Sequence, residues 1–96
     1  MLELKPICEN CAKLLPNDSI EAMICTYECT FCATCVNDIL KNVCPNCGGG
    51  FEKRPTRPTA LLHKNPASTK PHHQPINKEA FQLKLDKYID IAPEKR

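Results

Sequence analysis

The sequence has few of the side chains that build an ordinary hydrophobic core. It contains no tryptophan, and its aromatic residues are two tyrosines and three phenylalanines among 96 residues. A chain of this length buries only a modest share of its surface, so such a core is marginal by itself. We therefore expect cross-links, either disulfide bonds or bound metal, to stabilise the fold.

Long apolar runs are also absent. No segment approaches the roughly 20 apolar residues of a membrane-spanning helix. The N-terminal stretch MLELKPICENC lacks the apolar core and the cleavage site of a signal peptide. These absences predict a cytoplasmic protein that does not bind membranes. In that reducing compartment, paired cysteines hold metal more often than they form disulfide bonds.

Cysteine is what the first half of the chain has in excess. The eight cysteines form four closely spaced pairs, which are Cys8 and Cys11, Cys25 and Cys29, Cys32 and Cys35, and Cys44 and Cys47. Four thiolates complete the tetrahedral shell of one Zn²⁺ ion, with zinc–sulfur bonds of about 2.3 Å. The pairs therefore predict two bound Zn²⁺ ions with no cysteine left over.

The stretch CTYECTFCATC, residues 25–35, also allows iron. Cys25, Cys29 and Cys32 have the C-x3-C-x2-C spacing of clusters that cleave S-adenosylmethionine, but those clusters need a barrel far larger than this chain. Cys29, Cys32 and Cys35 have the spacing that opens a ferredoxin run, but no fourth cysteine follows three residues later. An iron–sulfur cluster is therefore the alternative to zinc.

The four pairs can be combined in two ways. In a sequential scheme, one ion binds Cys8, Cys11, Cys25 and Cys29, and the other binds Cys32, Cys35, Cys44 and Cys47. In a cross-braced scheme, site 1 consists of Cys8, Cys11, Cys32 and Cys35, and site 2 consists of Cys25, Cys29, Cys44 and Cys47. The secondary structure that the sequence predicts favours the cross-braced scheme.

A short hairpin and a short helix are expected around these cysteines. Residues 20–25, IEAMIC, alternate in polarity and predict a strand that turns back through Thr26 and Tyr27. Residues 33–43, ATCVNDILKNV, have helical apolar spacing, with Thr34 as a candidate N-cap. A knuckle, a hairpin and a helix N-terminus around one ion make the treble-clef arrangement, and the helix dipole favours thiolates there.

A small hydrophobic centre is expected between the two sites. It should contain Leu14, Leu15, Ile24, Phe31, Val36, Ile39, Leu40 and Val43. Backbone N–H groups around residues 48–50, the three glycines, are expected to donate to the sulfurs of Cys44 and Cys47.

Composition divides the chain into four parts. We predict a metal-stapled α+β domain at 1–53, a proline-rich basic linker at 54–76, an amphipathic helix at 77–92 and a tail at 93–96. Residues 1–53 carry four Lys or Arg and seven Asp or Glu, whereas residues 54–96 carry nine and four. An acidic head is thus followed by a basic tail.

The linker should be extended and largely unpacked, because its five prolines fix φ and remove hydrogen-bond donors. It is either a solvated connection or a docking strip for a partner. Its three histidines, which are His63, His72 and His73, are expected to be exposed to solvent rather than bound to metal.

The helix at 77–92 has one apolar face, formed by Phe81, Leu85, Tyr88, Ile89 and Ala92. Asn77 is placed to cap it and Pro93 to end it, although the alternation at residues 81–85 also allows a strand. A lone helix of this length is marginal in water. We expect it to pack on the head, with self-association or a partner helix as alternatives.

The order and spacing of the eight cysteines resemble an all-cysteine RING finger, with Cys29 where histidine usually stands. The resemblance implies a cross-braced two-zinc fold and, in eukaryotes, recruitment of ubiquitin-conjugating enzymes. RING ligases usually carry an apolar residue inside the first pair and a basic residue after the last cysteine. Glu9, Asn10 and Gly48 stand at those places, so the resemblance implies the fold more than the activity.

A second resemblance covers about two thirds of the chain. The strings MLELKPICENC, ICTYECTFCATC, VCPNCGGGF and RPTRP are similar to a family of small bacterial cysteine-rich proteins, domain of unknown function 1272. The resemblance implies a RING-like zinc-binding fold in a bacterial cytoplasm. It implies no reaction.

Catalysis is not expected. A catalytic zinc ion needs an open coordination position, and two closed four-cysteine sites have none. We therefore expect a non-enzymatic zinc protein that acts as a protein-interaction or regulatory module. One alternative is a nucleic-acid binder that places Arg54, Arg57, Lys64 and Lys70 on phosphates, and another is a RING-type accessory to ubiquitin ligation.

Overall fold

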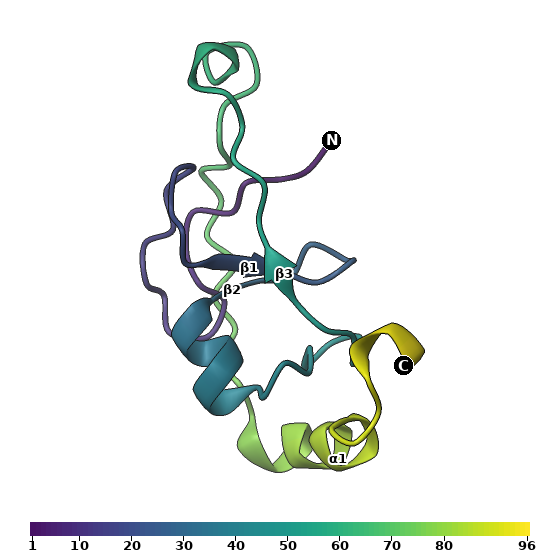
Figure 1. Cartoon of the computed structure of the whole chain (residues 1–96). Coiled ribbons are helices and arrows are strands. Elements are labelled where there is room, and N and C mark those ends of the chain that lie inside the picture. The colour runs from purple at the N-terminus through teal and green to yellow at the C-terminus, as the bar shows by residue number, and fades with distance from the viewer.

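The computed structural model describes residues 1–96 and shows a small α+β fold (Figure 1). Its sheet has three short antiparallel strands in the order β2-β1-β3, which are β1 (Ala22–Ile24), β2 (Thr30–Cys32) and β3 (Glu52–Lys53). In the register of β1 and β2, Ala22 pairs with Cys32 and Ile24 pairs with Thr30. The predicted hairpin is confirmed, and its turn is at Thr26 and Tyr27.

The predicted short helix follows β2 directly. It begins at Ala33 and widens into a π-helical turn, η1 (Cys35–Ile39), in which the Leu40 N–H donates to the Cys35 carbonyl over 2.8 Å. The predicted N-cap is wrong, since Thr34 has helical dihedrals and its side chain accepts no capping bond. The first N–H of the helix, that of Ala33, donates instead to the Glu21 carbonyl beside the hairpin.

The core lies between the hairpin, η1 and the loops that carry the cysteines. Buried as predicted are Leu15, Phe31, Val36, Leu40 and Val43, and Phe51 stacks edge-on against Phe31. The prediction is wrong for Leu14 and Ile39, which are 75% and 38% exposed. Leu14 precedes buried Leu15 in an extended segment, where neighbours point to opposite faces. At Ile39 the wide π turn breaks the 3.6-residue spacing on which the prediction rested.

After β3 the chain enters the segment that we expected to be an unpacked linker. Arg54 is only 1% exposed, and its guanidinium donates to the carbonyls of Lys5, Leu15 and Pro16 over 2.9–3.1 Å. The Ser68 N–H donates to the Leu4 carbonyl over 3.0 Å. The segment is therefore mostly extended, as predicted, but it is not unpacked.

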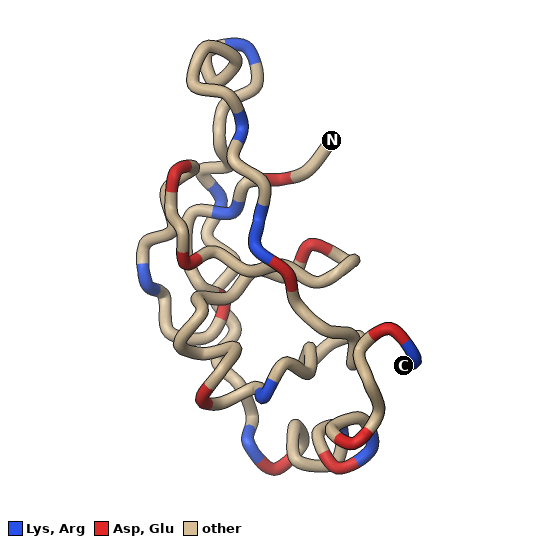
Figure 2. Tube along the Cα trace, in the orientation of Figure 1, with Lys and Arg blue, Asp and Glu red and all other residues tan.

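Part of this segment forms a loop that protrudes from the body of the molecule (Figure 1). A 3-10 turn, η2 (Thr59–Leu61), lies within it, and Arg57 donates to the carbonyls of Asn65 and Leu2. Figure 2 shows Lys and Arg on this loop with no acidic residue among them.

The C-terminal helix α1 (Lys78–Tyr88) is shorter than predicted, and the chain continues into a 3-10 turn, η3 (Pro93–Lys95). Asn77 caps α1 as predicted, accepting a hydrogen bond from the Ala80 N–H over 3.1 Å. Phe81 lies in the core at 7% exposure, with Leu85 and Tyr88 packed against it. The expectation that the helix packs on the head is confirmed. No helix here is both long enough and apolar enough to cross a bilayer.

Candidate metal centres

The four-cysteine group joins the first and third cysteine pairs. The sulfurs of Cys8, Cys11, Cys32 and Cys35 all lie within 4.8 Å of one another. Two of the sulfur–sulfur distances are 3.8 Å, from Cys8 to Cys35, and 3.7 Å, from Cys11 to Cys32. Cys11 is exposed, whereas the other three cysteines are buried.

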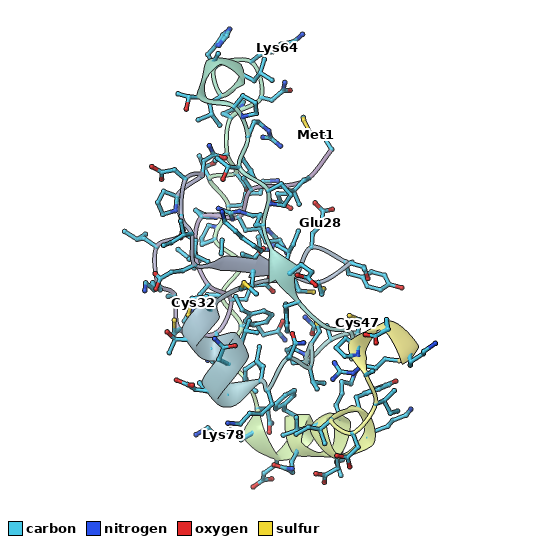
Figure 3. All side chains as sticks on the ribbon, viewed as in Figure 1. Met1, Glu28, Cys32, Cys47, Lys64 and Lys78 are labelled. Carbon is cyan, nitrogen blue, oxygen red and sulfur yellow. The ribbon has the colours of Figure 1, made fainter.

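The three-cysteine group joins the second and fourth pairs. The sulfurs of Cys25, Cys44 and Cys47 lie within 4.8 Å of one another. Cys25 directly follows β1, and the other two come from the loop between η1 and β3. Figure 3 shows Cys32 and Cys47, one from each group, at separate places on the head.

Cys29 stands beside the three-cysteine group rather than within it. A hydrogen bond from the Cys44 thiol lowers the pKa of Cys29 to about 5, and the Cys25 thiol acts in the same direction. The Cys25 N–H donates to the Cys29 carbonyl over 3.2 Å, which closes the hairpin turn. Seven of the eight predicted ligands are therefore grouped first pair with third and second pair with fourth, and Cys29 lies outside the 4.8 Å limit.

Two turns of the same shape present the first and last pairs. In the first knuckle, Cys8–Cys11, the Ala12 N–H donates to the Cys8 carbonyl over 3.0 Å. In the second knuckle, Cys44–Cys47, the Gly48 N–H donates to the Cys44 carbonyl over 2.8 Å. Ala12 and Gly48 have φ of 64° and 79°. A residue in this left-handed conformation ends each knuckle, and the two sulfurs of each knuckle belong to one cysteine group.

Each knuckle carries an asparagine that reaches a sulfur of the other pair in its group. Asn10 Nδ2 donates to Cys35 Sγ over 3.3 Å, and Asn46 Nδ2 donates to Cys29 Sγ over 3.3 Å. N–H donors of this kind offset the charge of a metal-bound thiolate. Neither asparagine was predicted as a sulfur donor, although the string C-x-N-C occurs at both knuckles.

The predicted glycine donors are partly confirmed. The Gly49 N–H donates to Cys47 Sγ over 3.4 Å. The backbone donors to Cys44 come from Asn46 and Cys47 instead of the glycines.

Burial disfavours the charged thiolate form of several of these cysteines. It raises the pKa of Cys35 far above its usual value, and it raises the pKa of Cys25 to about 11. The hydrogen bond that the Cys44 thiol donates to Cys29 raises the pKa of Cys44, and burial acts in the same direction. A metal ion would displace the protons of the thiols whose pKa is raised, because only the thiolate binds the metal.

The second knuckle is also where close packing requires glycine. A Cβ on Gly48 would lie 2.5 Å from Cε2 of Tyr88, at a position that already has positive φ. We expect Gly48→Ala to lower the free energy of unfolding by about 2–3 kcal/mol, from backbone strain and overpacking together. Denaturant unfolding at fixed metal concentration measures this.

The matched control for that experiment is Gly49→Ala. A Cβ there would meet only Cys47 Sγ, at 3.4 Å, and no positive φ is involved. We expect a clearly smaller loss. Equal losses in the two variants would contradict the assignment of the cost to φ and Tyr88.

Comparison with known proteins places this arrangement in a family. The model of a protein family of unknown function, DUF1272, matches residues 1–57, more than half of the chain. The chain belongs to the DUF1272 family. An uncharacterised protein of Rhizobium meliloti (strain 1021) is 58% identical over 69 residues, which cover 72% of this chain and 82% of that protein. No solved structure matches the chain significantly.

The part of the chain that matches the DUF1272 model contains both cysteine groups, both knuckle asparagines and Arg54. The protruding loop beyond Arg57 and helix α1 lie outside it. The resemblance noted in the sequence is thereby confirmed at the level of the family.

Proposed function

We propose that the protein is a non-enzymatic zinc protein in which two Zn²⁺ ions hold a cross-braced, RING-like head that binds another protein. The observation that carries the proposal is the grouping of the cysteines, first pair with third and second pair with fourth. Knuckle, hairpin and helix start meet at the four-cysteine group, as they do in a treble clef.

The four-cysteine group fits zinc in detail. A tetrahedron with zinc–sulfur bonds of about 2.3 Å has edges of about 3.8 Å. The Cys8–Cys35 and Cys11–Cys32 sulfur distances of 3.8 and 3.7 Å have that length. These four residues would hold site 1.

Site 2 would be held by Cys25, Cys29, Cys44 and Cys47. Cys29 belongs here because Asn46 donates to its sulfur as Asn10 donates to that of Cys35. The Cys29 thiol also forms hydrogen bonds with those of Cys44 and Cys25, two members of the three-cysteine group. When bound, the ions would supply structural cross-links. Four cysteine ligands fill the coordination shell of each ion, so no position remains for a substrate.

The metal is tested by composition. We expect protein purified without oxygen and without added metal to be colourless and to hold two zinc ions per chain by mass spectrometry. Iron with sulfide and a brown colour would overturn the zinc proposal and favour the iron–sulfur alternative.

The ligand sets are tested without mutation, by cadmium-113 NMR of protein in which cadmium replaces the metal. Each cadmium resonance should correlate with the β-protons of its own four cysteines. We expect one resonance to correlate with Cys8, Cys11, Cys32 and Cys35 and the other to include Cys29. A resonance that joins Cys8 to Cys25 would establish the sequential scheme instead.

The two alternative functions lose support from specific contacts. Phosphate binding was expected of Arg54 and Arg57, but Arg54 is buried and both guanidinium groups donate to carbonyls. Lys64 and Lys70 remain exposed. RING-type recruitment would need the surface of the first knuckle, and residues 73–76 of the same chain contact it.

A further inference from the structure

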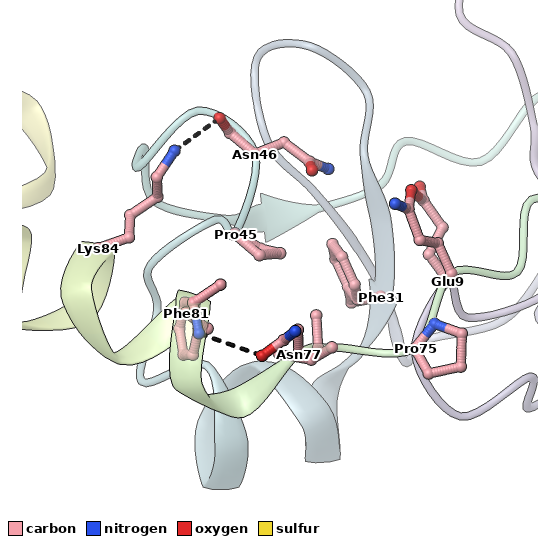
Figure 4. Close-up of a pocket in the computed structure, with 11 residues that line it drawn as sticks. Glu9, Phe31, Pro45, Asn46, Pro75, Asn77, Phe81 and Lys84 are labelled. Carbon is pink, nitrogen blue, oxygen red and sulfur yellow. Dashed lines mark hydrogen bonds between the residues drawn. The ribbon is translucent and has the colours of Figure 1, made fainter.

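A groove runs between the two knuckles and over the ring of Phe31. Glu9 lines it from the first knuckle, and Pro45 and Asn46 line it from the second (Figure 4). The chain's own residues 73–88, here called the C-terminal segment, cross this groove and leave a cavity of about 310 Å³. The segment lies outside residues 1–57, which match the family model.

The first half of the segment is hydrogen-bonded to Glu9 and Asn10 of the first knuckle. The Gln74 N–H donates to the Glu9 carbonyl over 2.8 Å, and the Ile76 N–H donates to Asn10 Oδ1 over 3.0 Å. His73 Nε2 lies 3.1 Å from the Asn10 carbonyl oxygen. This spacing of backbone bonds is how a groove holds an extended peptide.

The second half is held by one aromatic anchor and one cation. Phe81 enters the core from helix α1, and Lys84 Nζ donates to the Asn46 carbonyl over 2.9 Å (Figure 4). Leu83, on the outer face of α1, is 76% exposed. An isolated helix of this length is marginal in water, so its structure depends on the groove.

We propose that the groove between the knuckles is an exchangeable binding surface for a protein segment of this kind, an extended stretch followed by a short helix with an aromatic anchor. In this chain the C-terminal segment occupies it as a tethered ligand. The protruding loop is the tether, and a partner protein that presents such a segment would take the same place. This inference rests on the proposed function and names the partner class.

The knuckle asparagines make this binding depend on the metal sites. Asn10 donates through Nδ2 to Cys35 Sγ while its Oδ1 accepts from Ile76. Asn46 donates to Cys29 Sγ while its carbonyl accepts from Lys84. Each asparagine therefore joins one cysteine group to one half of the segment.

Peptide binding to the full chain tests the proposal. In the variant Phe81→Ala the anchor is lost, so the groove should be open while both zinc ions remain. A synthetic peptide of residues 73–96 should then bind with a dissociation constant below about 1 mM. It should bind the unmodified chain about tenfold more weakly, because a tethered segment competes at millimolar effective concentration.

Two controls match this experiment. The chain variant Leu83→Ala changes an exposed side chain of the same helix and should behave as the unmodified chain does. A peptide that carries Phe81→Ala should not bind.

The possible failures are distinguishable. If Phe81→Ala keeps two zinc ions but binds no peptide at millimolar concentration, the inference fails and the proposed function stands. If Phe81→Ala loses its metal, the segment is an integral part of the head and is not exchangeable. If the unmodified chain holds no zinc, the proposed function itself fails.

Discussion

Cys32→Ser is expected to unfold the head. Cys32 is buried at the end of β2, where it pairs with Ala22 and belongs to the four-cysteine group. Structural zinc contributes on the order of 10–16 kcal/mol in small domains. That exceeds the roughly 5–15 kcal/mol by which most whole domains are stable. We expect loss of the site 1 ion by mass spectrometry and loss of the near-ultraviolet dichroism of the aromatic residues.

Thr34→Ala is the matched control in the same turn. The Thr34 side chain is exposed and makes no capping bond, so this variant should keep both ions and the fold. A folded Cys32→Ser protein that retained both metals would overturn the ligand assignment.

Arg54→Ala is expected to have the largest effect among residues that are not cysteines. Its guanidinium satisfies three carbonyls, those of Lys5, Leu15 and Pro16, at a site closed to water. Truncation leaves buried acceptors unpaired, at about 1–3 kcal/mol each, and opens a cavity. We expect the free energy of unfolding to fall by about 3–5 kcal/mol while both metals remain bound, as measured by denaturant unfolding.

The neighbouring residue supplies the comparison for Arg54. Lys53 lies in β3 with an exposed side chain, and Lys53→Ala should change the stability by less than about 0.5 kcal/mol. Arg54→Lys keeps the charge but loses the planar guanidinium group with its several donors. Its loss of unfolding free energy should therefore lie between those of Lys53→Ala and Arg54→Ala. Similar small losses for both alanine variants would mean that the three carbonyls find water or other donors.

The features that could be predicted from the sequence are those with local signals. The hairpin follows from alternation in residues 20–25 and a turn at Thr26 and Tyr27. The grouping of cysteines follows from their spacing once the hairpin and the helix start are placed. The helical face that includes Phe81 and Leu85 predicted a helix that packs on the head.

The features that were missed depend on distant parts of the chain. β3 is a pair of exposed residues with no pattern of its own, and it forms because β1 has a free edge, where Met23 pairs with Lys53. In the sequence, Arg54 is indistinguishable from the other basic residues of the linker. It is buried because its guanidinium donates to carbonyls of the N-terminal loops, which are distant in sequence. The role of Asn10 and Asn46 as sulfur donors is visible only in the fold, where a sulfur of another cysteine pair lies beside each.

The grouping of the cysteines also constrains the order of assembly. The chain from Cys11 to Cys32 forms a loop closed by the four-cysteine group, and this loop contains Cys25 and Cys29. Closing a loop costs entropy that grows with the logarithm of its length. Once an ion has closed this loop, Cys25 and Cys29 are confined with it, so part of the entropy of assembling the second site is already lost. Occupation of one site would therefore favour occupation of the other, because the two sites share segments of the same chain.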